Sequence, residues 1–167
     1  MKTIELGVIE LGSKVIVTDP CYGLLATDLV KKVKEGKYIC TAYETKNSWG
    51  NRIAALRVVH EDFVNKYFNI DYNNEIAVSG VDSGQCGFFD YDYYKKHHGT
   101  DIVDYEMDED WYHRVCECTT QIPYAGTIDN KCVVSESGYG DGCYAAFGAY
   151  DGEELIAMEL CYILDED

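Results

Sequence analysis

The chain has 167 residues and carries 14 lysines and arginines against 30 aspartates and glutamates, a formal net charge of −16. This length fits a single domain over residues 1–167 that buries enough apolar surface to fold without disulfides or a metal. So acidic a surface argues against binding to nucleic acid or to an anionic membrane, because both depend on clustered lysine and arginine.

The first residues alternate charged and apolar side chains, and no run approaches the roughly 18 apolar residues that a membrane helix needs. We therefore expect a cytoplasmic protein. The eight cysteines are then expected to be mostly reduced, buried thiols. The alternative, a disulfide framework, belongs to short secreted chains.

Two strands are expected near the start, Thr3 to Ile9 and Lys14 to Thr18, joined as a hairpin across Gly12-Ser13. A short helix is expected from Asp28 to Lys34. An aspartate at its beginning and lysines near its end favour it, because these charges complement the helix dipole.

The middle of the chain predicts a mixture of strands and helices. The expected elements are strands over residues 37–46 and 52–59, a short helix over 61–68, and strands over 75–81 and 85–90. Asn73-Asn74 marks a turn before the third of these strands. Residues 108–118 fit either a helix, with Trp111 and Val115 at helical spacing, or an alternating strand, and both interpretations stay open.

Residues 131–164 predict an antiparallel meander with strands over 131–135, 143–150 and 155–163. Asp151-Gly152 is the hairpin turn between the last two, since Asp-Gly between apolar runs is a strong hairpin signal. The predicted fold class is α+β: a β-rich mixed or antiparallel sheet, or a partial barrel, with two or three short helices.

Three segments each place an aspartate in a loop of small residues. They are Asp19 to Tyr22, Val81 to Gln85 and Gly138 to Tyr144. Glycine lets a ligand approach the backbone closely, and a carboxylate accepts hydrogen bonds from ribose hydroxyls or binds a cation. The alternative interpretation is that aspartate and glycine only form turns here.

The segments TDPCY (18–22), VDSGQCGFFD (81–90) and GYGDGCY (138–144) resemble, in this order, a family of small uncharacterised proteins from bacteriophage and bacterial genomes. The resemblance implies no particular activity, but it implies that the three loops lie near one another. The candidate ligand-binding residues are Asp19, Tyr22, Asp82, Ser83, Gly84, Gln85, Gly140, Asp141, Gly142 and Tyr144.

Small phage proteins that sequester nucleotide immune signals suggest a function by context. The 15 tyrosines suit stacking on bases, and the arginines, Arg52, Arg57 and Arg114, suit bidentate contacts to phosphate. We expect a non-catalytic sponge for a small nucleotide-like ligand, of cyclic dinucleotide or cyclic ADP-ribose type. It would be a homo-oligomer in the cytosol of a bacterium or phage-infected host, with no cofactor and no metal.

Two alternative functions remain. One is a metal-dependent hydrolase that uses Asp19, Asp82 and Asp141, and the other is an acidic protein–protein inhibitor that mimics a polyanion. The run His113-x-x-Cys116-x-Cys118 has donor types suited to zinc but lacks a second close pair. No histidine lies within the three loops, so the sequence shows no nucleophile next to a base.

Overall fold

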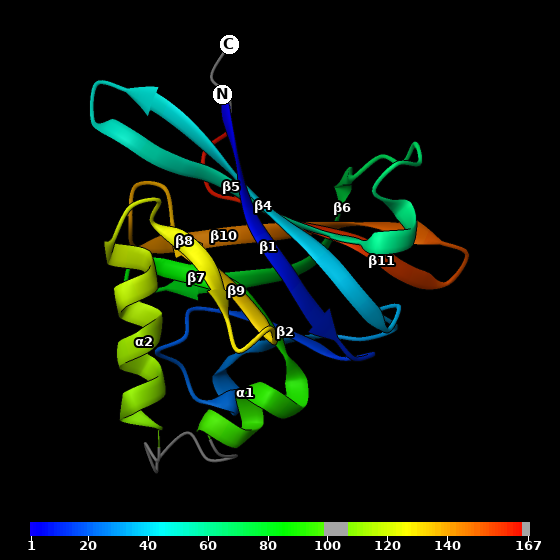
Figure 1. Ribbon diagram of the computed structural model, residues 1–167, viewed down its shortest axis with the longest axis horizontal. Coiled ribbons are helices and arrows are strands. Elements are labelled where there is room, and N and C mark those ends of the chain that lie inside the picture. Colours follow the sequence, from blue (N-terminus) through cyan, green and yellow to red (C-terminus); the bar gives the residue numbers. More distant parts are fainter. Residues whose placement is uncertain (99–106, 165–167) are drawn as a thin grey trace.

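The computed structural model describes residues 1–98 and 107–164. These residues form two open antiparallel sheets and two α-helices, which confirms the α+β class (Figure 1). The six-stranded sheet has the order β1-β4-β5-β11-β10-β6, and the five-stranded sheet has the order β3-β2-β7-β9-β8.

The first sheet contains β1 (Lys2–Leu11), β4 (Gly36–Asn47), β5 (Gly50–His60), β6 (Asp71–Val81), β10 (Gly142–Asp151) and β11 (Glu154–Cys161). The second contains β2 (Val15–Thr18), β3 (Asp28–Val30), β7 (Gln85–Asp90), β8 (Ala125–Ile128) and β9 (Cys132–Glu136). The helices are α1 (Tyr91–His98) and α2 (Glu109–Thr120), with 3₁₀ turns η1 (Leu24–Ala26) and η2 (Glu61–Phe63).

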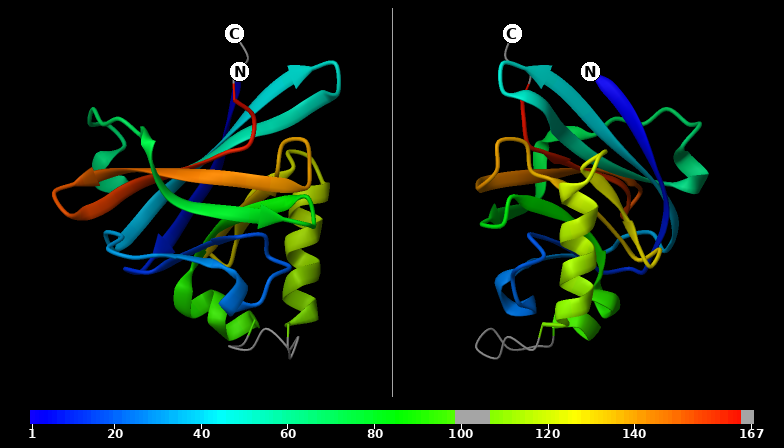
Figure 2. Two further views of the ribbon diagram at one scale, coloured as in Figure 1. Left: turned by 180° about the vertical axis from the view of Figure 1, so that it is seen from behind. Right: turned by 60° about the vertical axis from the view of Figure 1, so that its left-hand side comes forward.

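The five-stranded sheet is buried on both faces. Val17 and Phe88 belong to the core between the sheets, whereas their neighbours Ile16 and Phe89 pack with Trp111 under the helices. Figures 1 and 2 show the helices beside this sheet, away from the long β4–β5 hairpin. A strand covered on both faces needs apolar side chains in both directions, which explains the continuous apolar run of β2.

The hairpin predicted across Gly12-Ser13 is wrong. β1 pairs with β4 in one sheet, whereas β2 pairs with β3 and β7 in the other. The intervening residues carry the chain between the two layers, where the backbone N–H of Gly12 donates to Asp90 Oδ1 at 2.9 Å. Gly-Ser there connects two sheets and does not close a hairpin.

The helix predicted over residues 28–34 is also wrong. Asp28–Val30 forms β3 and pairs with Val15–Val17, and Lys32 adopts a left-handed φ of 57° that a right-handed helix excludes. The helix predicted over 61–68 is reduced to η2, and Asn73-Asn74 lies within β6 and forms no turn. In these segments pairing with a neighbouring strand outweighs local helix or turn preference.

The meander predicted over residues 131–164 is divided between the sheets. β9 pairs with β7 and β8, whereas β10 and β11 form the predicted hairpin in the other sheet, with the turn at Gly152-Glu153, one residue later than predicted. The helical interpretation of 108–118 is correct: Asp108 caps α2 by accepting from the backbone N–H of Trp111 at 3.1 Å. No helix in the described part of the chain is long and apolar enough to cross a membrane.

Candidate functional site

The carboxylate of Asp19, just beyond the end of β2, ties two of the three loops together. Its side chain is fully buried. Oδ1 accepts from the backbone N–H of Cys21 at 2.8 Å and from Ser83 Oγ at 2.6 Å. Oδ2 accepts from the backbone N–H groups of Asp82 and Ser83 at 2.9 and 2.7 Å. Four donors on one carboxylate fix the β6–β7 loop against the loop after β2.

The third loop, between β9 and β10, is joined to the second through the backbone. Ser137 N donates to the carbonyl of Gly84 at 3.0 Å, and Tyr144 Oη donates to the carbonyl of Gly140 at 2.7 Å. Gly84 and Gly140 have φ values of +71° and +105°, which favour glycine. Apart from the glycine and its two neighbours in the chain, no atom of the described residues lies within 4 Å of where a Cβ would stand at either position, so a ligand has room to approach the backbone.

These contacts bring the ten predicted residues together at one end of the two sheets, a surface called the loop face from here on. The exposed members are Asp82, Ser83, Asp141 and Gly142; the half-buried ones are Tyr22, Gly84, Gly140 and Tyr144; the buried ones are Asp19 and Gln85. The two buried side chains are bonded to protein groups, so they support the loops from inside.

Gln85 connects the loop face to α2. Its Oε1 accepts from Thr119 Oγ1 at 2.7 Å, and its Nε2 lies 3.5 Å from both Tyr112 Oη and Cys116 Sγ. The helix therefore forms one wall beside the loops. No sequence pattern predicts this contact, because it joins residues 27 to 34 positions apart.

The phenol of Tyr22 and the neighbouring thiol of Cys21 are held in their neutral forms. Tyr22 Oη donates to Asp82 Oδ2, and this hydrogen bond raises the pKa of the phenol. Burial, followed by the charge of Asp19, raises the pKa of the Cys21 thiol to about 12. A thiol with so high a pKa is protonated at neutral pH and is a poor nucleophile.

A hollow of about 340 Å³ lies between the tip of the β4–β5 hairpin and the β9–β10 loop. It is lined by Trp49, Arg52 and Tyr139. The two aromatic side chains are exposed by 72% and 58%. Asn47 Nδ2 donates to Tyr139 Oη at 2.7 Å and so joins hairpin and loop. Trp49 and Tyr139 were not among the predicted site residues, although a tryptophan in a turn-rich segment was visible in the sequence.

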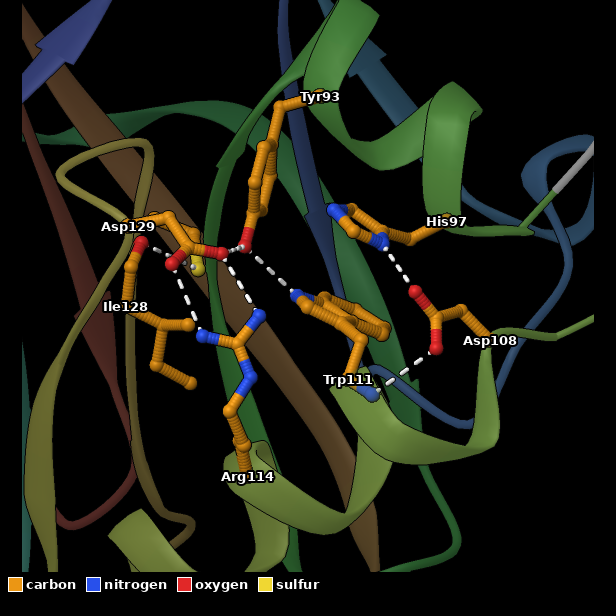
Figure 3. Close-up of polar contacts among 8 residues, drawn as sticks. Tyr93, His97, Asp108, Trp111, Arg114, Ile128 and Asp129 are labelled. Carbon is orange, nitrogen blue, oxygen red and sulfur yellow. Dashed lines mark hydrogen bonds and ion pairs between the residues drawn. The ribbon is translucent and has the colours of Figure 1, made fainter.

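A second polar cluster lies between the helices and the β8–β9 turn (Figure 3). Arg114 donates from both Nη atoms to the two carboxylate oxygens of Asp129, each at 2.9 Å. Tyr93 Oη also donates to Asp129, at 2.6 Å, and accepts from Trp111 Nε1 at 2.8 Å. The hydrogen bonds from Arg114 and Tyr93 lower the pKa of Asp129 to about 2. Donors and acceptors match one another in this cluster, so it clamps the helices to the sheet.

Residues 1–98 and 107–164 contain no group of three or more histidine, cysteine, aspartate or glutamate side chains placed to hold a metal ion. Of the run singled out for zinc, His113 lies on the exposed side of α2, with Nε2 3.1 Å from Glu117 Oε1. All eight cysteines are free of disulfides.

Comparison with known proteins gives a family but no activity. The model of a family described as "Protein of unknown function (DUF4241)" matches residues 11–158, a span that includes all three loops. No curated protein and no solved structure matches the chain.

Proposed function

The chain belongs to the DUF4241 family of proteins of unknown function, and we propose that it binds a small nucleotide-like ligand at the loop face without cleaving it. The observation that supports this most directly is the hydrogen bonding of Asp19. Its buried carboxylate fixes the loops after β2 and β6, while Asp82 and Ser83 in the same contact remain exposed. A rigid backbone that carries open polar side chains is preorganised for binding.

The chemistry of the loop face suits recognition of hydroxyl-rich ligands. The exposed carboxylates of Asp82 and Asp141 accept hydrogen bonds, as ribose hydroxyls require. The open space at Gly84 and Gly140 admits a ligand close to the backbone. Both features favour a sugar or nucleotide over an apolar molecule.

The same geometry does not favour catalysis. Ser83 Oγ is bonded to the carboxylate of Asp19 and so is not activated by an imidazole base, and the Cys21 thiol is protonated at neutral pH. Asp19, one of the three aspartates considered for a hydrolase, has both oxygens occupied by protein donors. It would have to give up these bonds to bind a metal or take a proton.

A thermal-shift screen of the full chain tests the proposal. The panel contains cyclic dinucleotides, cyclic ADP-ribose isomers, common nucleotides and divalent metals, and each hit is followed by heat release and chromatography of the ligand. A ligand at a hundredfold its Kd adds about 2.7 kcal/mol, which raises the melting temperature of a chain this size by roughly 5–10 °C. We expect a nucleotide hit recovered intact. Recovery as a product, or no shift with any nucleotide, would contradict the proposal.

Light scattering of the purified protein, with and without the hit, tests the accompanying expectation of a homo-oligomer. A monomer under both conditions would remove that part of the proposal.

A further inference from the structure

The three arginines of the chain have different partners. Arg57 is paired with Glu159, and Arg114 forms a bidentate pair with Asp129. Within the described residues, the guanidinium of Arg52 has no carboxylate within 4 Å, and its one hydrogen bond is from Nη1 to the carbonyl of Asn51 at 3.3 Å. Arg52 is therefore the arginine whose donors are open to an anion.

The two tryptophans differ in the same way. Trp111 of α2 is fully buried, whereas the side chain of Trp49 is 72% exposed in the turn between β4 and β5. Large aromatic side chains gain about 1.5–3 kcal/mol from burial, so a tryptophan left in water at a hairpin tip gives nothing to the core. Exposed aromatic rings on a rigid element are a common means of binding a planar ligand by stacking.

Trp49 and Tyr139 are positioned by one residue, Asn47. Its Oδ1 accepts from the backbone N–H of Trp49 at 2.9 Å, and its Nδ2 donates to Tyr139 Oη at 2.7 Å. Both rings and the Arg52 side chain line the hollow of about 340 Å³. Figures 1 and 2 show the hairpin tip and the β9–β10 loop projecting at the same side of the molecule.

We propose that Trp49, Arg52 and Tyr139 form a subsite for a planar aromatic ring that carries an anionic group, as in a nucleoside monophosphate. The inference rests on the proposed function and extends it, because Tyr139 lies in the same loop as Gly140 and Asp141. The rings stack on the base, and Arg52 donates to the phosphate. The remaining part of a larger ligand then extends onto the loop face.

The charge around the hollow limits which anions bind. The nearby Glu136 is half-buried and accepts from the backbone N–H of Ile53 at 3.2 Å; burial is the main cause of its raised pKa, and Arg52 opposes that shift. In a chain of net charge −16, an anion without a ring finds one arginine and a repulsive surface. Stacking supplies the remaining affinity, so free phosphate binds far more weakly than a nucleotide.

Titration of the full chain with AMP, adenosine and inorganic phosphate tests the subsite, with tryptophan fluorescence as the readout. We expect AMP to quench the exposed Trp49 in a saturable manner, with adenosine and phosphate each binding at least about tenfold more weakly. By calorimetry, Trp49→Ala and Tyr139→Ala should each weaken AMP binding by about 5- to 150-fold, the range for loss of one stacked base. Arg52→Ala should weaken it by about tenfold or more.

Two control variants match these changes. Lys46→Ala removes a positive charge from the opposite face of the same hairpin, since Lys46 pairs with Asn51 and Arg52 pairs with Thr45. Tyr67→Ala removes a tyrosine that is 91% exposed outside the hollow. Both should bind AMP as the wild type does.

The outcomes separate the subsite from the proposed function. Nucleotide binding that is unchanged in the three subsite variants but lost in Asp141→Ala would overturn the subsite and leave the loop face as the site. Equal losses in Arg52→Ala and Lys46→Ala would show a general effect of charge and would also overturn it. Absence of AMP binding to the wild type would overturn the subsite as well, and the screen described above would then decide the proposed function separately.

Discussion

The loop face and the polar cluster of Tyr93, Trp111, Arg114 and Asp129, called the helix cluster from here on, are each built around one aspartate. They use it differently. Asp19 is buried and accepts three of its four hydrogen bonds from backbone N–H groups. Asp129 is exposed and accepts from the side chains of Arg114 and Tyr93. The first arrangement fixes two loops mainly through their backbone and leaves several of their polar side chains exposed. In the second, the side chains bond to one another.

This difference is the reason for proposing a ligand site at the loop face. At the helix cluster the arginine is bonded at both Nη atoms and the tyrosine both donates and accepts. At the loop face the support comes from inside. Ser83 Oγ and Asp82 Oδ2 each have one protein partner, but the side chains of Asp82, Ser83 and Asp141 are exposed to solvent. A binding site needs supported loops that carry exposed polar groups, and within the described residues the loop face meets that condition better than the helix cluster.

The largest effect is expected for Asp19→Asn. An amide replaces one of the two acceptor oxygens with an NH₂ donor. This donor would face either the backbone N–H groups of Asp82 and Ser83 or that of Cys21, and those hydrogen bonds would be lost. We expect urea unfolding to show a loss of at least about 3 kcal/mol, since hydrogen bonds to charged groups contribute about 1.5–3 kcal/mol each. The matched change Asp82→Asn affects only the bond from Tyr22 and should cost less than about 1 kcal/mol. Similar losses for both variants would contradict the role given to Asp19.

A smaller loss is expected for Gln85→Leu, which removes the acceptor of Thr119 Oγ1 and separates the loop face from α2. Thr119 Oγ1 also donates to the carbonyl of Cys116 at 3.3 Å, so it keeps one partner in the variant. We therefore expect urea unfolding to show a loss of about 1–2 kcal/mol in the free energy of unfolding. The control Gln121→Leu changes an exposed glutamine just beyond α2 and should stay within about 0.5 kcal/mol. An unchanged free energy of unfolding for Gln85→Leu would mean that α2 does not support the loops.

The helix cluster should make the stability of the folded chain fall at acidic pH. The pKa of Asp129 is about 2 in the folded chain, against about 3.9 for an unperturbed aspartate, so its contribution to stability is present above about pH 4 and is lost as pH falls toward 2. Asp129→Asn keeps a residue that tolerates the left-handed φ of 53°. At pH 7 the variant should be less stable than the wild type by an amount typical of an exposed pair, about 1 kcal/mol or less in the free energy of unfolding. Its melting temperature should be lower accordingly. The difference should shrink at pH 2.5, and a constant difference would contradict the assignment.

The smallest effect on stability is expected for Trp49→Ala. An exposed ring at a hairpin tip should change the free energy of unfolding by no more than about 0.5 kcal/mol, while substitution of the buried Trp111 by alanine should cost about 3–5 kcal/mol. Chemical unfolding of both variants checks this contrast. A large loss for Trp49→Ala would mean that the hollow is a structural contact, not a subsite.

Local patterns predicted elements whose partners lie close in sequence. Apolar runs and turn residues alone predict the bounds of β7 and place the β10–β11 turn within one residue. The segment 28–30 was misread because its charges fit a helix, whereas its pairing with β2 depends on the fold of the whole chain. The same limit explains the false hairpin between β1 and β2, whose strands diverge into separate sheets.

The site shows the same division. Glycine and aspartate marked the three loops, and the structure brings them together. Sequence did not distinguish the supporting Asp19 from the exposed Asp82, because the loop that covers Asp19 lies 63 positions further along the chain. It named three arginines as possible phosphate contacts, but only the ion pairs of the folded chain show that Arg52 differs from Arg57 and Arg114.

Asp141→Ala is the sharpest test of ligand binding at the loop face. Asp141 is exposed and, within the described residues, its carboxylate makes no hydrogen bond or ion pair, so the variant should melt within about 2 °C of the wild type without ligand. In the nucleotide screen we expect the hit to raise the melting temperature of the wild type by roughly 5–10 °C and that of the variant by much less. An equal shift in both proteins would place the ligand elsewhere and contradict binding at the loop face.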